Sequence, residues 1–154
     1  MRALNKELLN RFKKQTPLPY CKDSNILESC KKCENNPCIS ICPTNIITKK
    51  DSRIYLDFKE NGCIFCKKCA EVCKSDSLGL LDLRENYINA LINLNEAKCL
   101  AWNKIICSYC NDVCENKSIE FISMLYPKIL ESCNKCGMCQ SACPKEAITF
   151  RGNF

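Results

Sequence analysis

The chain has 154 residues, of which 17 are cysteine and none is histidine, and its formal net charge is +6. So many cysteines indicate a framework of disulfides or bound metal. The absence of histidine excludes His-ligated zinc, His-ligated haem, Rieske clusters and most acid–base catalysis, and the four scattered glycines form no phosphate-binding loop.

Residues 1–24 are predicted to form a basic amphipathic segment. Leu4, Leu8, Leu9 and Phe12 recur at helical spacing, which more often indicates a helix packed on the body than a docking element for a partner. No signal-peptide pattern follows, and no apolar run approaches the ~20 residues that span a bilayer. We therefore expect a cytoplasmic protein without a membrane span, in which reduced thiols favour metal binding over disulfides.

Sixteen cysteines fall into four groups of four, and Cys21 is left over as a spare thiol. The groups are CKKCENNPCISICP (30–43), CIFCKKCAEVC (63–73), CLAWNKIICSYCNDVC (99–114) and CNKCGMCQSACP (133–144). An apolar run follows each last cysteine, and alternating apolar runs precede three first cysteines, at 54–63, 90–99 and 126–133. Such alternation predicts half-buried strands. Each unit is predicted to run strand, cysteine loop, short helix carrying the last cysteine, strand.

The spacing within the groups indicates iron–sulfur clusters. The fourth group, C-x2-C-x2-C-x3-C-P, is the run by which bacterial ferredoxins bind [4Fe–4S] clusters. The second has the same spacing with Lys74 in place of proline, and the first has four residues between Cys33 and Cys38. Zinc also binds four thiolates, but its sites use two separated cysteine pairs. We therefore predict [4Fe–4S] clusters as the cofactors.

The distances between the groups pair them into two modules. Twenty residues separate the first group from the second, eighteen the third from the fourth, and twenty-five the second from the third. The two shorter gaps each fit one strand–turn–strand connection. We predict an α+β fold of two tandem bacterial-ferredoxin-type modules with short strands and short helices. The predicted boundaries are 1–24 for the N-terminal segment, 25–82 for the N-terminal module, 83–89 for the connection and 90–154 for the C-terminal module.

In a two-cluster module the last cysteine of each run ligates the partner cluster. The predicted ligand sets are set 1 (Cys30, Cys33, Cys38 and Cys73), set 2 (Cys63, Cys66, Cys69 and Cys42), set 3 (Cys99, Cys107, Cys110 and Cys143) and set 4 (Cys133, Cys136, Cys139 and Cys114). Trp102 and Tyr109, inside the third group, are expected to shield a cluster.

Set 3 leaves two interpretations open, because seven residues separate its first two cysteines. In the first, Cys99 is a ligand and the chain holds four clusters, since Cys99 follows a strand-like run as other first cysteines do. In the second, Cys99 is a buried thiol, and the third site is vacant or labile, which leaves three clusters. The first interpretation is favoured, because the second leaves three other cysteines unexplained.

Bound clusters also change the meaning of the basic charge. Each cluster with four thiolates carries roughly −2, so four would bring the net charge to about −2. The charge then gives no support for nucleic acid as a partner. All sixteen grouped cysteines serve as ligands and no substrate-binding residue can be named, so we expect a protein that is not an enzyme.

The third group carries a resemblance to one family. The paired motifs, followed by a strand, CLAWNKIICSYCNDVC and CNKCGMCQSACPKEAI, resemble the NapF-type ferredoxins over roughly residues 26–152. The C-x7-C-x2-C-x3-C step beginning Cys-Leu-Ala is the discriminating part, since ordinary ferredoxins lack it. The start of the chain departs from the family, in which a twin arginine is common and where this sequence has only NRFKK.

The resemblance implies a cytoplasmic accessory protein of the periplasmic nitrate reductase system. Its implied partner is the precursor of the catalytic subunit, which it would help to acquire an iron–sulfur cluster before export. The alternative is a redox chain that passes electrons between a donor and an oxidoreductase, so that the partner is another redox protein. Lys74 and Glu115 stand where proline is expected, and the more open loops that this predicts favour the maturation role.

Overall fold

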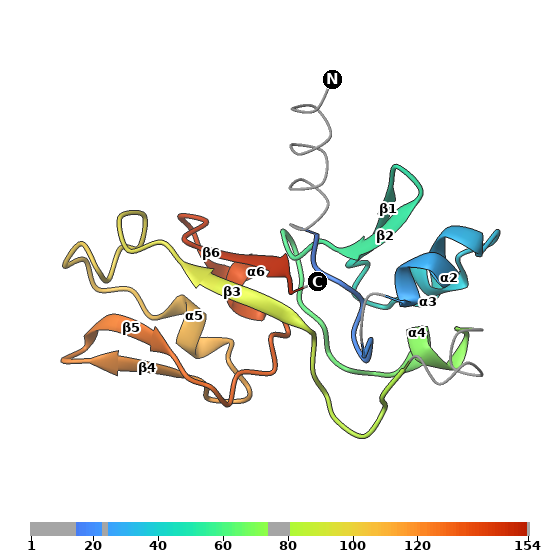
Figure 1. Cartoon of the computed structure of the whole chain (residues 1–154). Coiled ribbons are helices and arrows are strands. Elements are labelled where there is room, and N and C mark those ends of the chain that lie inside the picture. Colours follow the sequence, from blue (N-terminus) through green and yellow to red (C-terminus); the bar gives the residue numbers. More distant parts are fainter. Residues whose placement is uncertain (1–14, 23–24, 74–80, 154) are drawn as a thin grey trace.

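The computed structural model describes residues 15–22, 25–73 and 81–153, which form two halves of similar build (Figure 1). The N-terminal half contains α2 (Ile26–Lys32), α3 (Pro37–Ile41), β1 (Ile47–Lys50), β2 (Arg53–Leu56) and α4 (Lys68–Glu71). The C-terminal half contains β3 (Ala90–Leu94), α5 (Tyr109–Asp112), β4 (Ile119–Ile122), β5 (Leu125–Ile129), α6 (Met138–Ala142) and β6 (Ile148–Gly152). Short helices mixed with short strands confirm the predicted α+β class.

Two expectations concern residues that the structure does not describe. The amphipathic stripe of Leu4, Leu8, Leu9 and Phe12 lies outside the described residues, and so does Lys74. Within the described part of the chain, no helix has the length and apolar character that crossing a bilayer requires.

Each half contains one antiparallel hairpin between its two cysteine groups. β1 pairs with β2, and β4 pairs with β5. Both hairpins turn through two residues of positive φ, Asp51 and Ser52 in the first and Ser123 and Met124 in the second. Positive φ at both central residues is the type I′ turn, whose twist matches that of the strands it joins. The strand–turn–strand connections expected from the gap lengths are therefore present.

The outer strands of the two halves correspond. β3 pairs antiparallel with β6 along five residues of each strand. At the equivalent place in the N-terminal half, a single antiparallel bridge joins Cys21 to Leu81, and a second bridge joins Thr16 to Leu56. Residues 15–22 therefore pack on the N-terminal module, whereas the residue bounds of the modules stay a prediction.

The short helices carry the third cysteine of each group, so the prediction that they carry the last one is wrong. The third cysteines, in α3, α4, α5 and α6, are Cys38, Cys69, Cys110 and Cys139. The last cysteine follows the helix, and Cys42 and Cys143 are C-cap residues with extended ψ values of 113° and 110°. The backbone must leave the helix there because the next strand begins only a few residues later. The first group also begins within a helix, since α2 contains Cys30.

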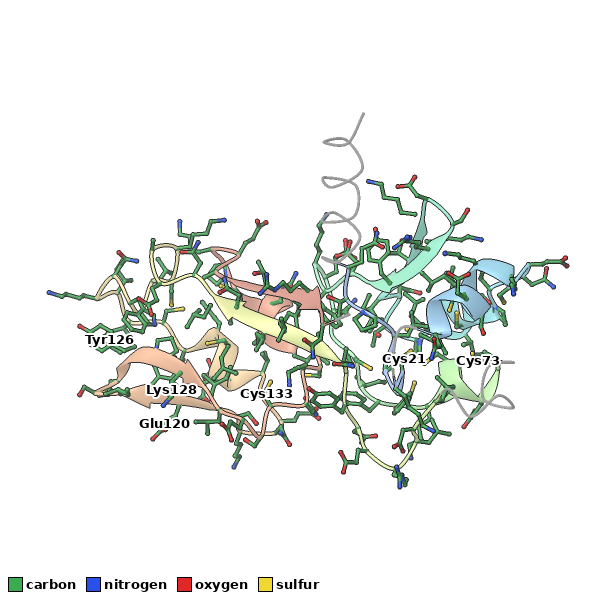
Figure 2. The ribbon with its side chains drawn as sticks, in the orientation of Figure 1. Cys21, Cys73, Glu120, Tyr126, Lys128 and Cys133 are labelled. Atoms are coloured by element: carbon green, nitrogen blue, oxygen red, sulfur yellow. The ribbon has the colours of Figure 1, made fainter. Side chains whose placement is uncertain are left out.

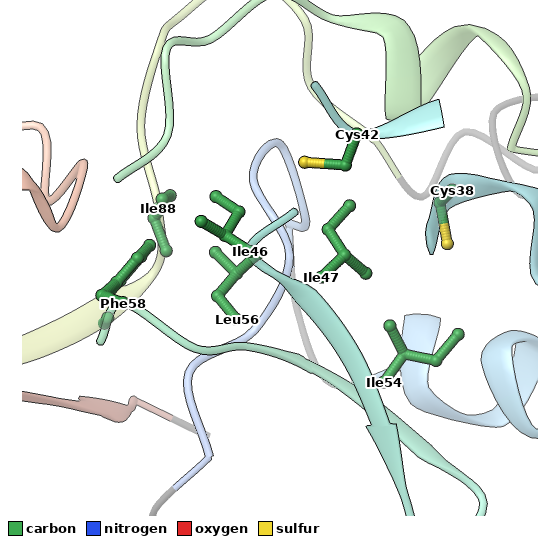
Figure 3. Packing of buried hydrophobic residues seen from close by; sticks show 9 residues of the cluster. Cys38, Cys42, Ile46, Ile47, Ile54, Leu56, Phe58 and Ile88 are labelled. Carbon is green, nitrogen blue, oxygen red and sulfur yellow. The ribbon is translucent and has the colours of Figure 1, made fainter. Parts of the chain in front are cut away.

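The two halves meet around Phe58, which is 2% exposed. Its ring lies 5.2 Å from that of Phe150 in an edge-to-face arrangement at 74°. Figure 3 shows Phe58 beside Ile88 in a buried cluster, with the aliphatic residues of β1 and β2 around them. Because Phe150 comes from β6, this cluster joins the N-terminal module to the C-terminal one.

Two glycines allow the backbones of the two halves to approach each other at this junction. Gly137 has φ 86°, and a Cβ there would lie 2.3 Å from Cγ of Phe58. A Cβ on Gly62 would lie 2.6 Å from the backbone nitrogen of Met138. Beside them the N–H of Cys63 donates to the carbonyl of Cys136 at 2.7 Å. The junction therefore depends on close backbone packing as well as on the aromatic pair.

Gly137→Ala should loosen this junction. The added methyl group overpacks Phe58, which costs about 1–3 kcal/mol, and it also forces a side chain into left-handed φ at about 1–2 kcal/mol. The midpoint of thermal unfolding of anaerobically prepared protein, followed by circular dichroism, should fall. Lys67→Ala is the matched control, because Lys67 already has φ 62° at the equivalent position before α4. A Gly137→Ala protein that unfolds at the parental midpoint would contradict the packing described.

Candidate metal centres

The structure gathers the grouped cysteines into the four sets expected from their spacing. Three hollows of nearly equal volume, about 330, 330 and 360 Å³, are lined by sets 2, 4 and 3 respectively. In each hollow one thiol comes from the other group of the same half, as cross-ligation requires. All seventeen cysteines are free of disulfides. That these sets are ligands of iron stays a prediction.

Set 1 lines a much larger hollow, of about 1410 Å³, and all four of these volumes include open solvent. Cys21 and Cys69 share the hollow with the four cysteines of the set, and the exposed residues Lys32 and Glu34 also line it. Of the four hollows that are each lined by a complete set, the hollow of set 1 is the largest.

The sets are arranged as ligands of a cluster would be. Among the described residues, no three Cys, Asp or Glu side chains converge as they would on a single metal ion. In a [4Fe–4S] cluster each thiolate binds a different iron, so the ligands surround a hollow instead of meeting at one point. The cluster fits these sets, and when bound it supplies reversible one-electron chemistry.

A repeated turn positions the last cysteine of a group. The carbonyls of Cys42, Cys114 and Cys143 each accept a hydrogen bond, at 3.0–3.2 Å, from the N–H three residues further on. The donor residue has positive φ each time, so the chain doubles back towards the thiol. The N–H groups of Ser118 and Ala147 then donate to Sγ of Cys114 and Cys143, both at 3.3 Å. Such bonds favour the thiolate, the form that binds metal.

Several other thiols resist ionisation. Burial, with a smaller contribution from neighbouring thiols, raises the pKa of Cys30 and of Cys63 to about 12. At Cys42 burial also opposes ionisation, but hydrogen bonds from the Thr44 hydroxyl and from nearby N–H groups outweigh it and lower the pKa. Thiolates crowded into one hollow need positive charge among them, and bound iron would supply it.

Although seven residues separate Cys99 from Cys107, the turn that they form keeps Cys99 within set 3. In the turn at residues 100–106, the backbone N–H and the Nδ2 of Asn103 donate to the carbonyl of Cys99 at 3.1 and 2.7 Å. Cys99 is 8% exposed and lines the same hollow as the rest of set 3. Burial first, and then Cys99 and the other thiols of set 3, raise the pKa of Cys110 to about 11. This placement favours Cys99 as a ligand.

Two aromatic residues lie at or near set 3. Tyr109 lines the hollow of set 3, and Trp102 packs behind it against the buried cluster of Cys99, Ala101 and Ala147. The indole N–H of Trp102 donates to the carbonyl of Pro127 at 3.4 Å. Because Tyr109 is 59% exposed, the shielding of a cluster by these two residues stays a prediction.

Tyr20 is a site residue that sequence reasoning missed. It is 3% exposed and lines the hollow of set 2, and its hydroxyl hydrogen has no acceptor among the described residues. Burial first, and then the thiols of Cys63 and Cys69, raise the pKa of Tyr20. The hydroxyl is therefore a donor held beside set 2. No motif includes Tyr20, so the sequence carried no signal for it.

The four sets form a row in the order 1, 2, 4, 3. Cys69 of set 2 also lines the hollow of set 1. The N–H of Cys63 in set 2 donates to the carbonyl of Cys136 in set 4, and Cys110 of set 3 packs against the buried cluster that contains Cys139 of set 4. The middle step crosses the junction at Phe58, so the row runs through both halves.

Comparison with known families identifies the chemistry of these sets. A family model described as a 4Fe-4S dicluster domain matches residues 29–78, and one described as a 4Fe-4S binding domain matches residues 126–149. These ranges include the first, second and fourth cysteine groups. The chain therefore contains ferredoxin-type domains that bind [4Fe–4S] clusters, as predicted, while the number of clusters stays a prediction.

Individual proteins show the same relationship. The ferredoxin-type protein NapF of Escherichia coli (strain K12) is 33% identical over 133 residues, covering 82% of this chain and 78% of that protein. Hydrogenase-4 component A of the same strain is 48% identical over 44 residues, 29% of this chain and 20% of that protein. Formate hydrogenlyase subunit 2 is 41% identical over 44 residues, 29% of this chain and 21% of that protein. The two shorter matches cover only 44 residues each. The match to NapF covers 133 residues and therefore extends over both halves.

Iron analysis tests the ligand sets. Four clusters predict about sixteen irons per chain in anaerobically purified protein, and three predict about twelve. Cys99→Ala should lose between one and four irons, because set 3 then has three thiolates. Ser108→Ala is the matched control, since it removes a side-chain oxygen from the same loop and should keep the parental iron content. Unchanged iron in Cys99→Ala would exclude Cys99 as a ligand.

Proposed function

The chain belongs to the NapF family of ferredoxin-type proteins, and from this we propose that it is an accessory iron–sulfur protein for the maturation of a periplasmic nitrate reductase. In this proposal sets 1 to 4 each hold one [4Fe–4S] cluster. The partner is the precursor of the catalytic subunit, which acquires its own cluster before export. The proposed location is the cytoplasm, where the precursor is made and where thiols stay reduced. The chain binds and carries, and no catalytic role is assigned to it.

The room around set 1 is the observation that carries the maturation role. A cluster that is passed to another protein must be reached by the thiolates of that protein. The hollow of set 1, at about 1410 Å³, is about four times as large as those of the other sets, which are 330–360 Å³. The exposed side chains of Lys32 and Glu34 line it. Set 1 is therefore the proposed site of transfer.

The missing prolines can be compared with the structure at one position only, because Lys74 lies outside the described residues. Cys114, which precedes Glu115, belongs to set 4, whose hollow of about 330 Å³ is no larger than that of set 2. The expected opening of the loop at Glu115 is thus not found, because the hydrogen bond from Ser118 to Sγ of Cys114 closes the turn.

Electron transfer is the second candidate function, and the row of sets favours it. Sets 1, 2, 4 and 3 follow one another through both halves, and the middle step is bridged by the 2.7 Å hydrogen bond from Cys63 to Cys136. A row of clusters would carry electrons between a donor at one end and an oxidoreductase at the other. The names of two relatives place them in a hydrogenase and in formate hydrogenlyase, so by likeness the partner would be a redox enzyme.

Chelator sensitivity separates the two functions. If set 1 supplies a cluster, an iron chelator should remove about four of about sixteen irons in a fast first phase, followed by absorbance and iron release. Cys30→Ala/Cys73→Ala, which lacks two ligands of set 1, should lack that phase. Four clusters that resist the chelator and titrate reversibly would count against maturation and for electron transfer.

Capture of the partner tests the proposal directly. The tagged holoprotein should retain the nitrate reductase precursor, with its signal peptide present, under anaerobic conditions. The mature subunit without the signal peptide and the cluster-free chain are the controls, and both should be retained less. A precursor that fails to bind the holoprotein would overturn the assignment of partner.

A further inference from the structure

Cys21 lies outside the four cysteine groups, and its place in the sequence suggested a spare thiol. In the structure it is 7% exposed and lines the hollow of set 1. It belongs to a buried cluster with Ile26, Ala70 and Leu81, against which Cys30 and Cys73 pack. Figure 2 shows Cys21 and Cys73 next to each other in the N-terminal half. The thiol of Cys21 therefore belongs to the lining of the hollow of set 1.

Cys21 is positioned as an additional ligand of set 1 would be. The antiparallel bridge to Leu81 fixes its backbone at the hollow, and no hydrogen bond to its thiol is found among the described residues. A buried thiol therefore lines the space that a cluster would fill.

Set 1 differs in this respect from the other three sets. The hollows of sets 2, 3 and 4 are each lined by the four cysteines of the set and by no further one among the described residues. The hollow of set 1 is lined by its own four, by Cys21 and by Cys69, which belongs to set 2. One thiol is therefore in excess of the ligands that sets 1 and 2 require.

We propose that Cys21 is a fifth ligand of set 1, which can replace Cys73 or Cys30 on the cluster. The exchange is a ligand substitution without electron transfer. The Cys21 thiol releases its proton and its thiolate forms one Fe–S bond, while the Fe–S bond to the displaced cysteine breaks and that thiolate takes up a proton. Irons, sulfides and total charge are unchanged. The inference rests on the proposed function only in that set 1 must hold a cluster.

A fifth ligand explains how set 1 can be both open and stable. A cluster in a roomy hollow loses iron when solvent or a chelator replaces one thiolate. With Cys21 beside Cys30 and Cys73, an iron that loses either bond is recaptured before the cluster breaks up. Release of the cluster then requires that several ligands be displaced together, by a docked precursor or by an excess of chelator.

Iron and acid-labile sulfide contents of the anaerobically reconstituted full chain test this exchange. Cys73→Ala should keep about sixteen irons, because Cys21 takes the open position. Cys21→Ala/Cys73→Ala should lose one to four irons, with a [3Fe–4S] signal in the electron paramagnetic resonance spectrum where only one is lost. Cys114→Ala is the matched control, because Cys114 is the corresponding cross-ligand of set 4 and has no spare thiol beside it. It should lose iron as a single substitution.

Two outcomes would overturn the role of Cys21. One is a Cys73→Ala protein that loses as much iron as the double variant, and the other is a double variant that loses none. If Cys73→Ala does not fold, Cys30→Ala compared with Cys21→Ala/Cys30→Ala makes the same test. Cys30→Ala/Cys73→Ala removes two ligands, so an unchanged iron content there would show that set 1 holds no cluster. Unchanged iron in this double variant would refute the proposed function at set 1. If the double variant loses iron, set 1 does hold a cluster, and the single variants then decide whether Cys21 is a ligand.

Discussion

The rest of this fold depends on one constraint, which is that each half brings eight thiols together in two adjoining sets. The described helices have four to seven residues and the strands four or five, and elements of that size bury too little apolar surface to hold a domain together unaided. Each set takes its fourth cysteine from the neighbouring group, so every set joins two groups of the same half. Because burial raises the pKa of thiols such as Cys30 and Cys63, the thiolates need iron among them. We therefore expect cluster binding and folding to be coupled.

The junction at Phe58 turns two modules into one continuous row. If the halves were joined only by their connecting chain, sets 2 and 4 would have no defined relation. The Phe58–Phe150 contact, the close approach at Gly137 and the Cys63–Cys136 hydrogen bond hold these sets next to each other. The row of sets therefore continues across the junction between the two halves. The same packing leaves set 1 at one end of the row, where the exposed residues Lys32 and Glu34 line its hollow.

Three cysteines of each set could be predicted because they lie close together in the sequence, and the fourth followed from the cross-ligation of two-cluster modules. Features that depend on other contacts distant in sequence could not be predicted. The pentapeptide Ile-Leu-Glu-Ser-Cys lies in α2 at 26–30 but runs from the end of β5 into a turn at 129–133. In α2 the Glu28–Lys31 ion pair supports a helix, whereas Ile129 pairs with Ile119 of β4. Likewise, Cys21 seemed spare because its place depends on a bridge to Leu81, sixty residues away.

Maturation and electron transfer require different properties of a cluster, and different sets in the row have these properties. A cluster that carries electrons keeps all its ligands. Sets 2 and 4 lie in small hollows at the centre of the row, and in each of them one cysteine, Cys63 or Cys114, accepts a backbone N–H hydrogen bond at its Sγ. A cluster that is handed over must exchange ligands, and only the hollow of set 1 combines a large volume with an additional thiol. Ligand exchange at a [4Fe–4S] cluster is easier to control when the entering thiolate is already in place, since an iron left open to water is lost. Cys21 would confine that exchange to one end of the row, while the ligands of the remaining sets stay fixed.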